Sequence, residues 1–169
     1  MRWDGVSAIE KYTGLHNAII KLEEMRHHSF DTKHYESKDR VAPINIGTVR
    51  AGQWHSTVPE SIIAEGRLGV FPNESNEEAR KNFEDHVFEF SKNDSWLTEN
   101  PPEIEWFEGQ FESGQTPIDD PLIKELSSAY KNVLNREAVI EGVTYGSDLR
   151  LFTNHAHIPS VLFGPGDVR

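Results

Sequence analysis

Two stretches decide the fold prediction: PINIGTVRAG, residues 43–52, and SIIAEGRLGV, residues 61–70. In the first, Ile44 and Ile46 fall on one face of an extended chain and Asn45 falls on the other, as in a half-buried strand. The second stretch alternates in the same way. Because only the loop GQWHSTVPE separates them, we predict an antiparallel pair of strands.

Two helices and a third strand are predicted around this pair. Apolar residues recur every three or four positions over residues 5–25, which indicates an amphipathic helix, and the polar residues 24–40 predict a solvated loop. Ser75 and Glu78 have the spacing of a capping box and predict the start of a second helix. Residues 101–111, PPEIEWFEGQF, alternate again and predict the third strand.

The order helix, strand, strand, helix, strand predicts the fold class of residues 1–113. It is that of an α+β, ferredoxin-like unit, a split β-α-β arrangement whose first strand is missing. Residues 114–169 show a different pattern, with helices and continuous apolar runs. We therefore predict that they are the remnant of an α/β domain, with the boundary at about residue 113.

The elements of this second part follow from local signals. Asp120 and Pro121 suit the cap and first position of a helix. Residues 138–140 predict a short strand, and the apolar run PSVLFG, residues 159–164, predicts a strand buried on both faces. The helix is expected to bury Leu122, Leu126, Ala129 and Val133.

Composition and charge exclude several classes of partner. The formal net charge is -11, and an acidic surface repels phosphate backbones and anionic lipid headgroups, so we expect neither a nucleic-acid nor a membrane partner. The chain has no cysteine, no apolar run of about 20 residues, and no secretion signal at its N-terminus. These features predict a soluble, cytoplasmic protein.

Several stretches taken in order resemble one enzyme family. They are GVSAIEK, STVPESIIAEGRLGVFPNES, EIEWF, and YGSDLR followed by IPSVLFGPGD. The ordered set is similar to the metal-dependent amidohydrolases and peptidases of the acetylornithine deacetylase and succinyl-diaminopimelate desuccinylase family. The resemblance implies that residues 1–113 are a lid and dimerisation domain and that residues 114–169 are the C-terminal part of the catalytic domain.

The resemblance also implies the chemistry and the partners. Two divalent ions, zinc or cobalt, would activate water for hydrolysis of the amide bond of an N-acyl amino acid or small peptide, in a homodimer formed through the lid. The family's metal ligands and general base match no position of this chain, so we expect no catalytic residue, no bound metal and no hydrolysis by the chain alone. The alternative is a non-catalytic dimerisation or binding module.

Five residues are the candidate substrate-binding set. Arg150, in the GSDLR motif, matches an arginine that grips a substrate carboxylate in the family, although an ordinary surface arginine is the alternative. Ser56 stands where many members carry an asparagine that reaches the neighbouring subunit's site. The backbone of Gly164, Pro165 and Gly166 would lie against the substrate.

Other positions in these motifs carry weaker implications. Gly69 stands where some members have a substrate-binding arginine, and Arg67 where they have the preceding aspartate, so that role is not carried over. Asp148 is expected to cap a short helix. Ser147 lacks the Gly-x-Ser-x-Gly setting of a nucleophilic serine, so we do not expect nucleophilic catalysis.

The histidines suggest metal binding only weakly. His27 and His28 lie in a polar stretch and are expected to be solvated. His155 and His157 have a spacing that can chelate a metal, but no third ligand or carboxylate lies near them in the sequence. His55, next to Trp54, is a weak candidate for lining the inner edge of the lid.

Overall fold

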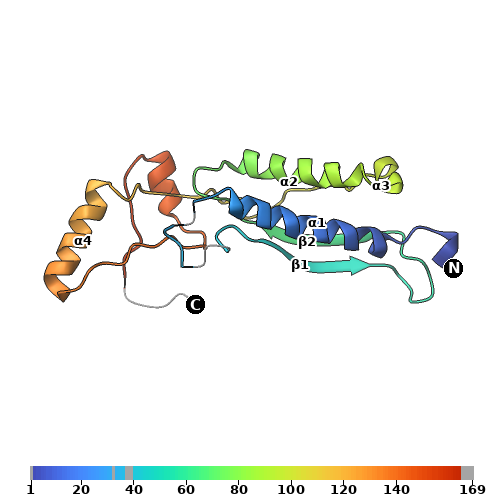
Figure 1. The fold of residues 1–169 in the computed structure, drawn as a ribbon, viewed down its shortest axis with the longest axis horizontal. Coiled ribbons are helices and arrows are strands. Elements are labelled where there is room, and N and C mark those ends of the chain that lie inside the picture. The colour runs from blue at the N-terminus through green and yellow to red at the C-terminus, as the bar shows by residue number, and fades with distance from the viewer. Residues whose placement is uncertain (1, 32, 37–39, 165–169) are drawn as a thin grey trace.

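The computed structural model describes residues 2–31, 33–36 and 40–164. Helices α1 and α2 lie along the strand pair β1 and β2, whereas α4 and the turn η2 lie at the opposite end of the molecule from the N-terminus (Figure 1). No helix in this part of the chain is long and apolar enough to cross a bilayer. The elements are η1 (Arg2–Asp4), α1 (Ala8–His28), β1 (Ile44–Ala51), β2 (Ile62–Leu68), α2 (Asn76–Ser91), α3 (Ser95–Glu99), α4 (Pro121–Leu134) and the π-helical turn η2 (Leu151–His155).

The predicted strand pair is confirmed. β1 and β2 pair antiparallel, with Ile44 opposite Leu68 and Ala51 opposite Ile62. A bulge between Ile46 and Thr48 shifts the register by one residue. An extra residue in one strand increases the local twist of such a pair.

Helix α1 is also confirmed, but it runs three residues beyond the predicted end. Its start is capped by Ser7, whose Oγ accepts a hydrogen bond from the backbone N–H of Glu10 at 3.4 Å. Near its end, Arg26 and His27 are buried rather than solvated. The polarity of these side chains predicted a loop, but both are buried because each finds hydrogen-bond partners within the fold.

Part of the predicted solvated loop belongs to the core. Val41, Ala42 and Phe71 are buried together, and Phe30 and Tyr35 pack against them. The Phe30 and Phe71 rings stack with centroids 4.4 Å apart. Phe30 and Tyr35, the aromatic residues of this mostly polar segment, therefore stabilise the end of α1. The prediction of a solvated loop over residues 24–40 is wrong for these two positions.

Helix α2 begins as predicted, with the capping box of Ser75 and Glu78 formed in both directions. It packs closely on α1 at Gly14, where an added Cβ would lie 3.0 Å from Cζ of Phe90. A glycine is unfavourable in a helix interior, but here it allows the aromatic ring to approach the α1 backbone. His86 Nε2 also lies 2.9 Å from the carbonyl oxygen of Ala18 in α1.

The predicted third strand does not form: within the described chain, residues 101–111 make no ladder with another strand. Pro101 and Pro102 lack the backbone N–H that pairing requires. The segment contacts α2 through side chains instead, because Trp106 Nε1 donates to Glu84 Oε1 at 2.6 Å. The alternation in this segment therefore reflects packing on a helix, and the complete ferredoxin-like arrangement stays a prediction.

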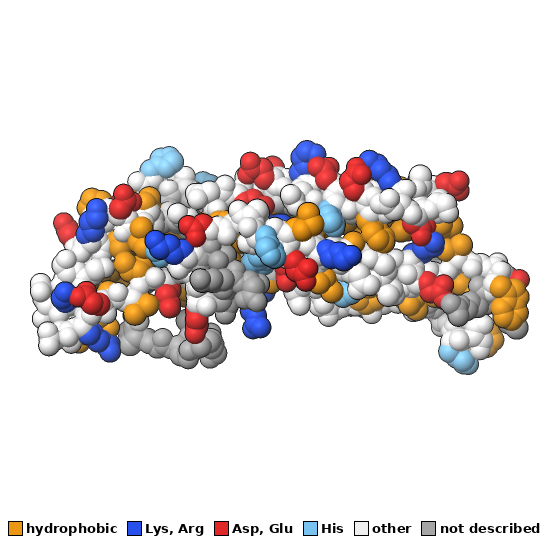
Figure 2. Space-filling view, viewed as in Figure 1, with side chains coloured by type: hydrophobic (Ala, Val, Ile, Leu, Met, Phe, Trp, Pro, Cys, Tyr) orange, Lys and Arg blue, Asp and Glu red, His pale blue; other side chains and the backbone are white. Residues whose placement is uncertain are grey.

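Helix α4 starts at the predicted cap, where the Asp120 side chain accepts from the N–H of Leu122 at 2.8 Å. The predicted buried face is wrong: Val133 is 79% exposed, and only Ile123 of this helix is buried. Residues 138–140 and 159–164 form no strands because no other strand lies beside them in the described structure. Figure 2 shows hydrophobic side chains gathered on the visible surface at the α4 end. The assignment of residues 114–169 to an α/β domain stays a prediction.

Candidate functional site

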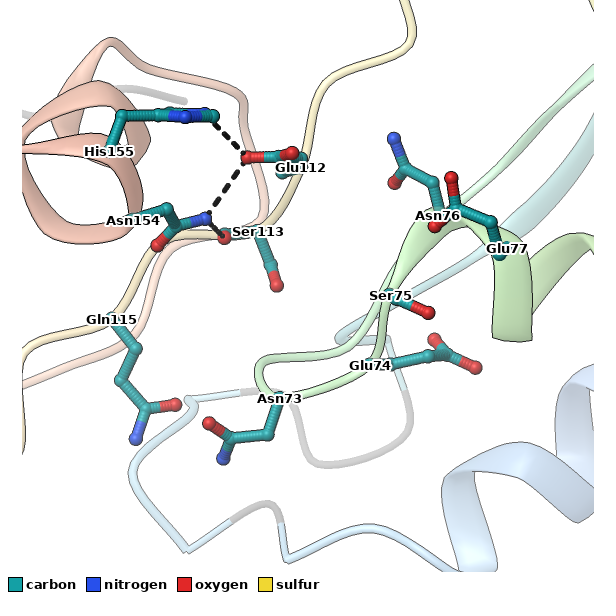
Figure 3. Close-up of a pocket in the computed structure, with 10 residues that line it drawn as sticks. All are labelled: Asn73, Glu74, Ser75, Asn76, Glu77, Glu112, Ser113, Gln115, Asn154 and His155. Atoms are coloured by element: carbon teal, nitrogen blue, oxygen red, sulfur yellow. Dashed lines mark hydrogen bonds and ion pairs between the residues drawn. The ribbon is translucent and has the colours of Figure 1, made fainter.

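A polar cavity of about 410 Å³ lies between the start of α2 and the turn η2 (Figure 3). Three segments that are distant in the sequence form it: the loop that enters α2, the chain that leaves the 101–111 segment, and the end of η2. Its lining residues are all polar or charged. They are Asn73, Glu74, Ser75, Asn76, Glu77, Glu112, Ser113, Gln115, Asn154 and His155.

One wall of the cavity is a hydrogen-bonded group centred on Glu112. Its Oε2 accepts from Asn154 Nδ2 at 3.2 Å and lies 3.0 Å from His155 Nε2 (Figure 3). Asn154 Nδ2 also donates to the carbonyl oxygen of Ser113 at 2.9 Å, and Ser113 Oγ donates to the carbonyl oxygen of Phe71 at 2.9 Å. These contacts tie η2 to residues 112–113 and to the loop before α2.

The same contacts keep Glu112 ionised. The hydrogen bond from Asn154 has the largest effect and lowers the pKa of the Glu112 carboxyl, whereas desolvation, the next largest effect, raises it. The hydrogen bond from His155 and the electrostatic effects of His155 and Arg150 add to the lowering, so the net direction is down. Glu112 is therefore a fixed carboxylate at neutral pH that presents acceptor oxygens at the cavity wall.

The opposite wall is the first turn of α2. Asn76 Nδ2 makes a long contact of 3.4 Å with the carbonyl oxygen of Gln110, while its Oδ1 is buried and has no hydrogen-bond partner among the described residues. Glu77 also lines this wall, and Glu74 forms an ion pair with Arg26, with 2.7 Å between Oε2 and Nη2. A buried acceptor without a donor is unfavourable, so this wall is suited to a ligand that brings an N–H group.

The charge of the cavity is negative. Three of the residues that line it are carboxylates, at positions 74, 77 and 112, and no lysine or arginine is among them. This arrangement favours a ligand that carries hydrogen-bond donors or a positive charge over an anion.

Arg150 lies next to this cavity but does not line it. Its guanidinium carbon is 4.7 Å from the centroid of the Phe111 ring, and its Nε is buried without a hydrogen-bond partner in the part of the chain described. Gly114 makes this placement possible, because an added Cβ there would lie 2.7 Å from the Arg150 Cα. The predicted role of Arg150 in binding a substrate carboxylate stays a prediction.

Of the remaining predicted substrate-binding residues, the described Ser56 and Gly164 do not line this cavity. Ser56 is exposed in the loop between β1 and β2, which lies at the N-terminal end of the molecule, away from η2 (Figure 1). An added Cβ at Gly164 would meet no described atom within 4 Å beyond its chain neighbours. Pro165 and Gly166 lie outside the described residues. Their predicted contact with a substrate stays a prediction.

The structure explains why no side chain stands at position 69. An added Cβ on Gly69 would lie 2.6 Å from the Cα of Ala42, and the Gly69 N–H donates to the carbonyl oxygen of Pro43 at 2.8 Å. The backbone at this point is packed directly against the chain that enters β1. Arg67 is exposed in β2, so neither position contributes to the cavity.

The turn before η2 is capped differently from the prediction. Ser147 Oγ accepts from the backbone N–H of Leu149 at 3.3 Å, and η2 has no side-chain cap. The predicted cap, Asp148, instead accepts from the N–H of Leu151 through its backbone carbonyl at 2.9 Å. The capping prediction for Asp148 is therefore wrong, because the serine hydroxyl takes the local N–H first.

The histidine predictions are corrected at two positions. His27 is buried: its Nε2 accepts from the N–H of Ala42 at 3.2 Å, so its Nδ1 donates to the carbonyl oxygen of Glu23 at 2.8 Å. His155 does have a carboxylate nearby, since Glu112 lies 3.0 Å away. The described residues nevertheless contain no group of three or more His, Cys, Asp or Glu side chains that could hold a metal ion.

The other three histidines considered in the sequence are exposed. His28 is exposed as predicted, with Nδ1 2.7 Å from the carbonyl oxygen of Glu24. His157 is exposed with a positive φ of 55°. His55 is exposed and packs only against the neighbouring Trp54 ring, with centroids 5.6 Å apart.

Sequence reasoning singled out Ser75 and His155 for other reasons and missed most of the residues that form the cavity. Glu112, Asn154 and Asn76 belong to no motif, and each is an ordinary surface residue type in its own segment. The one usable signal was the turn residue Gly114 two positions after Glu112, which marks a close approach of two backbones.

The comparisons with known proteins identify two relatives with the same name. The chain is 26% identical over 178 residues to the N-formyl-4-amino-5-aminomethyl-2-methylpyrimidine deformylase of Bacillus subtilis, covering 97% of this chain and 40% of that protein. It is 26% identical over 173 residues to the protein of that name from Halalkalibacterium halodurans, covering 96% and 39%. No protein-family model matches the chain. The chain thus spans about two fifths of the length of these curated relatives.

These relatives correct the family predicted from the sequence. Both are named for removal of a formyl group from an aminopyrimidine, not as an acetylornithine deacetylase, a succinyl-diaminopimelate desuccinylase or a peptidase. The predicted family and the predicted dinuclear hydrolase of N-acyl amino acids or peptides are therefore not supported. The alternative of a non-catalytic dimerisation or binding module stays an untested prediction. The ordered motifs were misassigned because short turn and strand motifs do not specify a substrate. The two divalent ions and the homodimer stay untested predictions.

Proposed function

We propose that this chain is the substrate-holding part of an amide hydrolase that removes the formyl group from a formylated aminopyrimidine. The observation that carries the proposal is the likeness to two relatives of this name along almost the whole chain. The negative, donor-accepting cavity supports it, because an aminopyrimidine offers N–H groups and no negative charge.

The reaction is the addition of water to the formyl carbon. The carbon–nitrogen bond breaks, formate leaves with the added oxygen, and the amine nitrogen takes a proton. We propose that the groups that activate water correspond to the part of the relatives that this chain does not match, since it covers 39–40% of their length. The role proposed for this chain is to bind and orient the pyrimidine, which raises the rate by fixing the amide near those groups.

A chimeric enzyme tests this function. The 169-residue chain replaces the matched region of the Bacillus subtilis relative, and formate release is measured with N-formyl-4-amino-5-aminomethyl-2-methylpyrimidine and, in parallel, acetate release with N-acetylornithine. We expect formate release and no acetate release. Acetate release without formate release, from a chimera whose circular dichroism matches that of the parent, would contradict the proposal.

Two further measurements address the untested predictions. Adding zinc or cobalt to a chelator-treated chimera, and comparing its rate before and after, tests the need for divalent ions. Light scattering of the isolated chain measures whether it is a dimer. Neither result bears on the choice of the pyrimidine as substrate.

A further inference from the structure

We propose that the cavity between α2 and η2 binds the aminopyrimidine ring itself. Asn76 forms hydrogen bonds with the edge of the ring, and Glu112 accepts a hydrogen bond from the aminomethyl nitrogen. The inference rests on the proposed function and names the binding residues for it. The first argument is size: about 410 Å³ falls within the range of roughly 300–1,000 Å³ that small-molecule pockets occupy.

The second argument is the unpaired amide of Asn76. A 4-aminopyrimidine carries a ring nitrogen acceptor beside an exocyclic amine donor, the pattern that a side-chain amide pairs with in adenine. Asn76 Oδ1 is buried without a described partner, and a turn of the side-chain amide toward the cavity lets it accept from the amine. Its Nδ2 makes only the 3.4 Å contact with Gln110, so it can donate to the ring nitrogen.

The third argument is the position and charge of Glu112. Figure 3 shows Glu112 across the gap from Asn76 and Glu77, so a ring held by Asn76 presents its substituents toward Glu112. One of the Glu112 oxygens is occupied by Asn154 and His155, which leaves the other, Oε1, with no contact that the structure records. A free carboxylate oxygen is a strong acceptor for an amide N–H or an ammonium group.

The site therefore distinguishes substrate from product by charge. In the formylated compound the aminomethyl nitrogen is a neutral amide, whereas in the deformylated product it is an ammonium group. Because Glu74, Glu77 and Glu112 make the cavity negative, we expect the product to bind more tightly than the formylated compound.

Nuclear magnetic resonance titration of the 169-residue chain tests the site. The ligand is 4-amino-5-aminomethyl-2-methylpyrimidine, and 2,5-dimethylpyrimidine, which lacks both amines, is the control ligand. We expect saturable shifts of the backbone amides of Asn76, Glu112 and Asn154 with the first compound only. A second groove lies between α1 and α2 and is lined by residues that include Asn17 and Asn93. Saturable shifts confined to that groove would overturn the assignment.

Matched variants sharpen the test. Glu112→Gln keeps the size of the side chain and removes its charge, and Asn76→Leu keeps its approximate size and removes both its donor and its acceptor without adding charge. We expect each to weaken binding of the diamine about tenfold, whereas the exposed Glu99→Gln, at the end of α3, leaves it unchanged. The two pocket substitutions lie on different segments, so misfolding of one does not remove the test.

The results also separate this inference from the proposed function. If both pocket variants bind the diamine as tightly as the unmodified chain while the chimera releases formate, the pocket assignment is wrong and the deformylase proposal holds. If the variants lose binding while the chimera releases no formate, the pocket assignment holds and the deformylase proposal is wrong. Absence of any saturable binding to the folded chain overturns the pocket assignment.

Discussion

The ion pair between Arg26 and Glu74 holds the end of α1 to the loop that enters α2, and its removal has a calculable cost. Arg26 is only 6% exposed and Glu74 20% exposed, with 2.7 Å between Nη2 and Oε2. The same Nη2 donates to the carbonyl oxygen of Gly69 at 3.0 Å, and the guanidinium lies 5.0 Å from the centroid of the Phe71 ring.

The substitution Arg26→Met removes these contacts but keeps most of the aliphatic stem. Each hydrogen bond to a charged group contributes about 1.5–3 kcal/mol, and breaking a buried pair from one side costs about 3–5 kcal/mol. Because Glu74 keeps partial access to water and a hydrogen bond from the Phe71 N–H, we expect the lower end, about 3 kcal/mol. For a chain of this size that is a fall in melting temperature of about 6–12 °C.

Urea unfolding followed by circular dichroism measures the change in free energy. The control is Arg50→Met, because Arg50 pairs with Glu65 at 3.0 Å while 69% exposed, and such surface pairs contribute about 0–1 kcal/mol. The double variant with both Arg26 and Glu74 replaced by Met should recover part of the loss, since no charge is then left buried alone. A loss below about 1 kcal/mol for Arg26→Met, or one equal to that of the Arg50 control, would refute this reasoning.

Three further predictions follow from local contacts. Ser75→Ala removes the side-chain cap of α2 and should lower the unfolding free energy by about 1 kcal/mol, measured by thermal melting. The hydrogen bond from Lys11, together with backbone N–H groups, lowers the pKa of Asp94. The Asp94 carboxylate therefore stabilises the folded chain fully above the ordinary carboxyl pKa, and this stabilisation is lost as the pH falls through the lowered pKa. Asp94→Ala should therefore destabilise the chain at pH 7, and urea titrations at decreasing pH should show the difference disappearing below about pH 4. Gly69→Ala should cost about 1–3 kcal/mol because the new methyl group would overlap the Ala42 backbone, and an unchanged melting temperature would contradict this.

The parts of the fold that the sequence predicted are those set by neighbours in the chain. The Ser75–Glu78 capping box, the Asp120 cap and the antiparallel pair with its short loop all depend on contacts within a few residues or across one hairpin. Residues 101–111 alternate in the same way, but strand formation also needs a partner with free N–H and C=O groups. Their side chains found α2 instead, through Trp106 and Glu84.

The candidate site could not be predicted for a different reason. Glu112 is held in place by hydrogen bonds with Asn154 and His155, which lie more than 40 positions away in the sequence. Asn76 is distinguished by its side-chain oxygen, which is buried at the start of α2. His155 was considered with its sequence neighbour His157, while its actual partner, Glu112, stands at the predicted domain boundary. The close approach of Gly114 to Arg150, together with the hydrogen bond from Asn154 to the Ser113 carbonyl oxygen, brings these segments together.

The hydrogen bond from Ser113 to the Phe71 carbonyl has a mechanical consequence. Residues 112–115 are an extended connection between the α1–α2 layer and the α4 end, and Glu112 and Ser113 form part of one cavity wall, opposite the first turn of α2. A molecule that contacts both walls opposes local opening of that connection, because it binds the closed arrangement and not the open one. Protease cleavage within residues 112–118 should therefore slow as ligand is added, in proportion to occupancy.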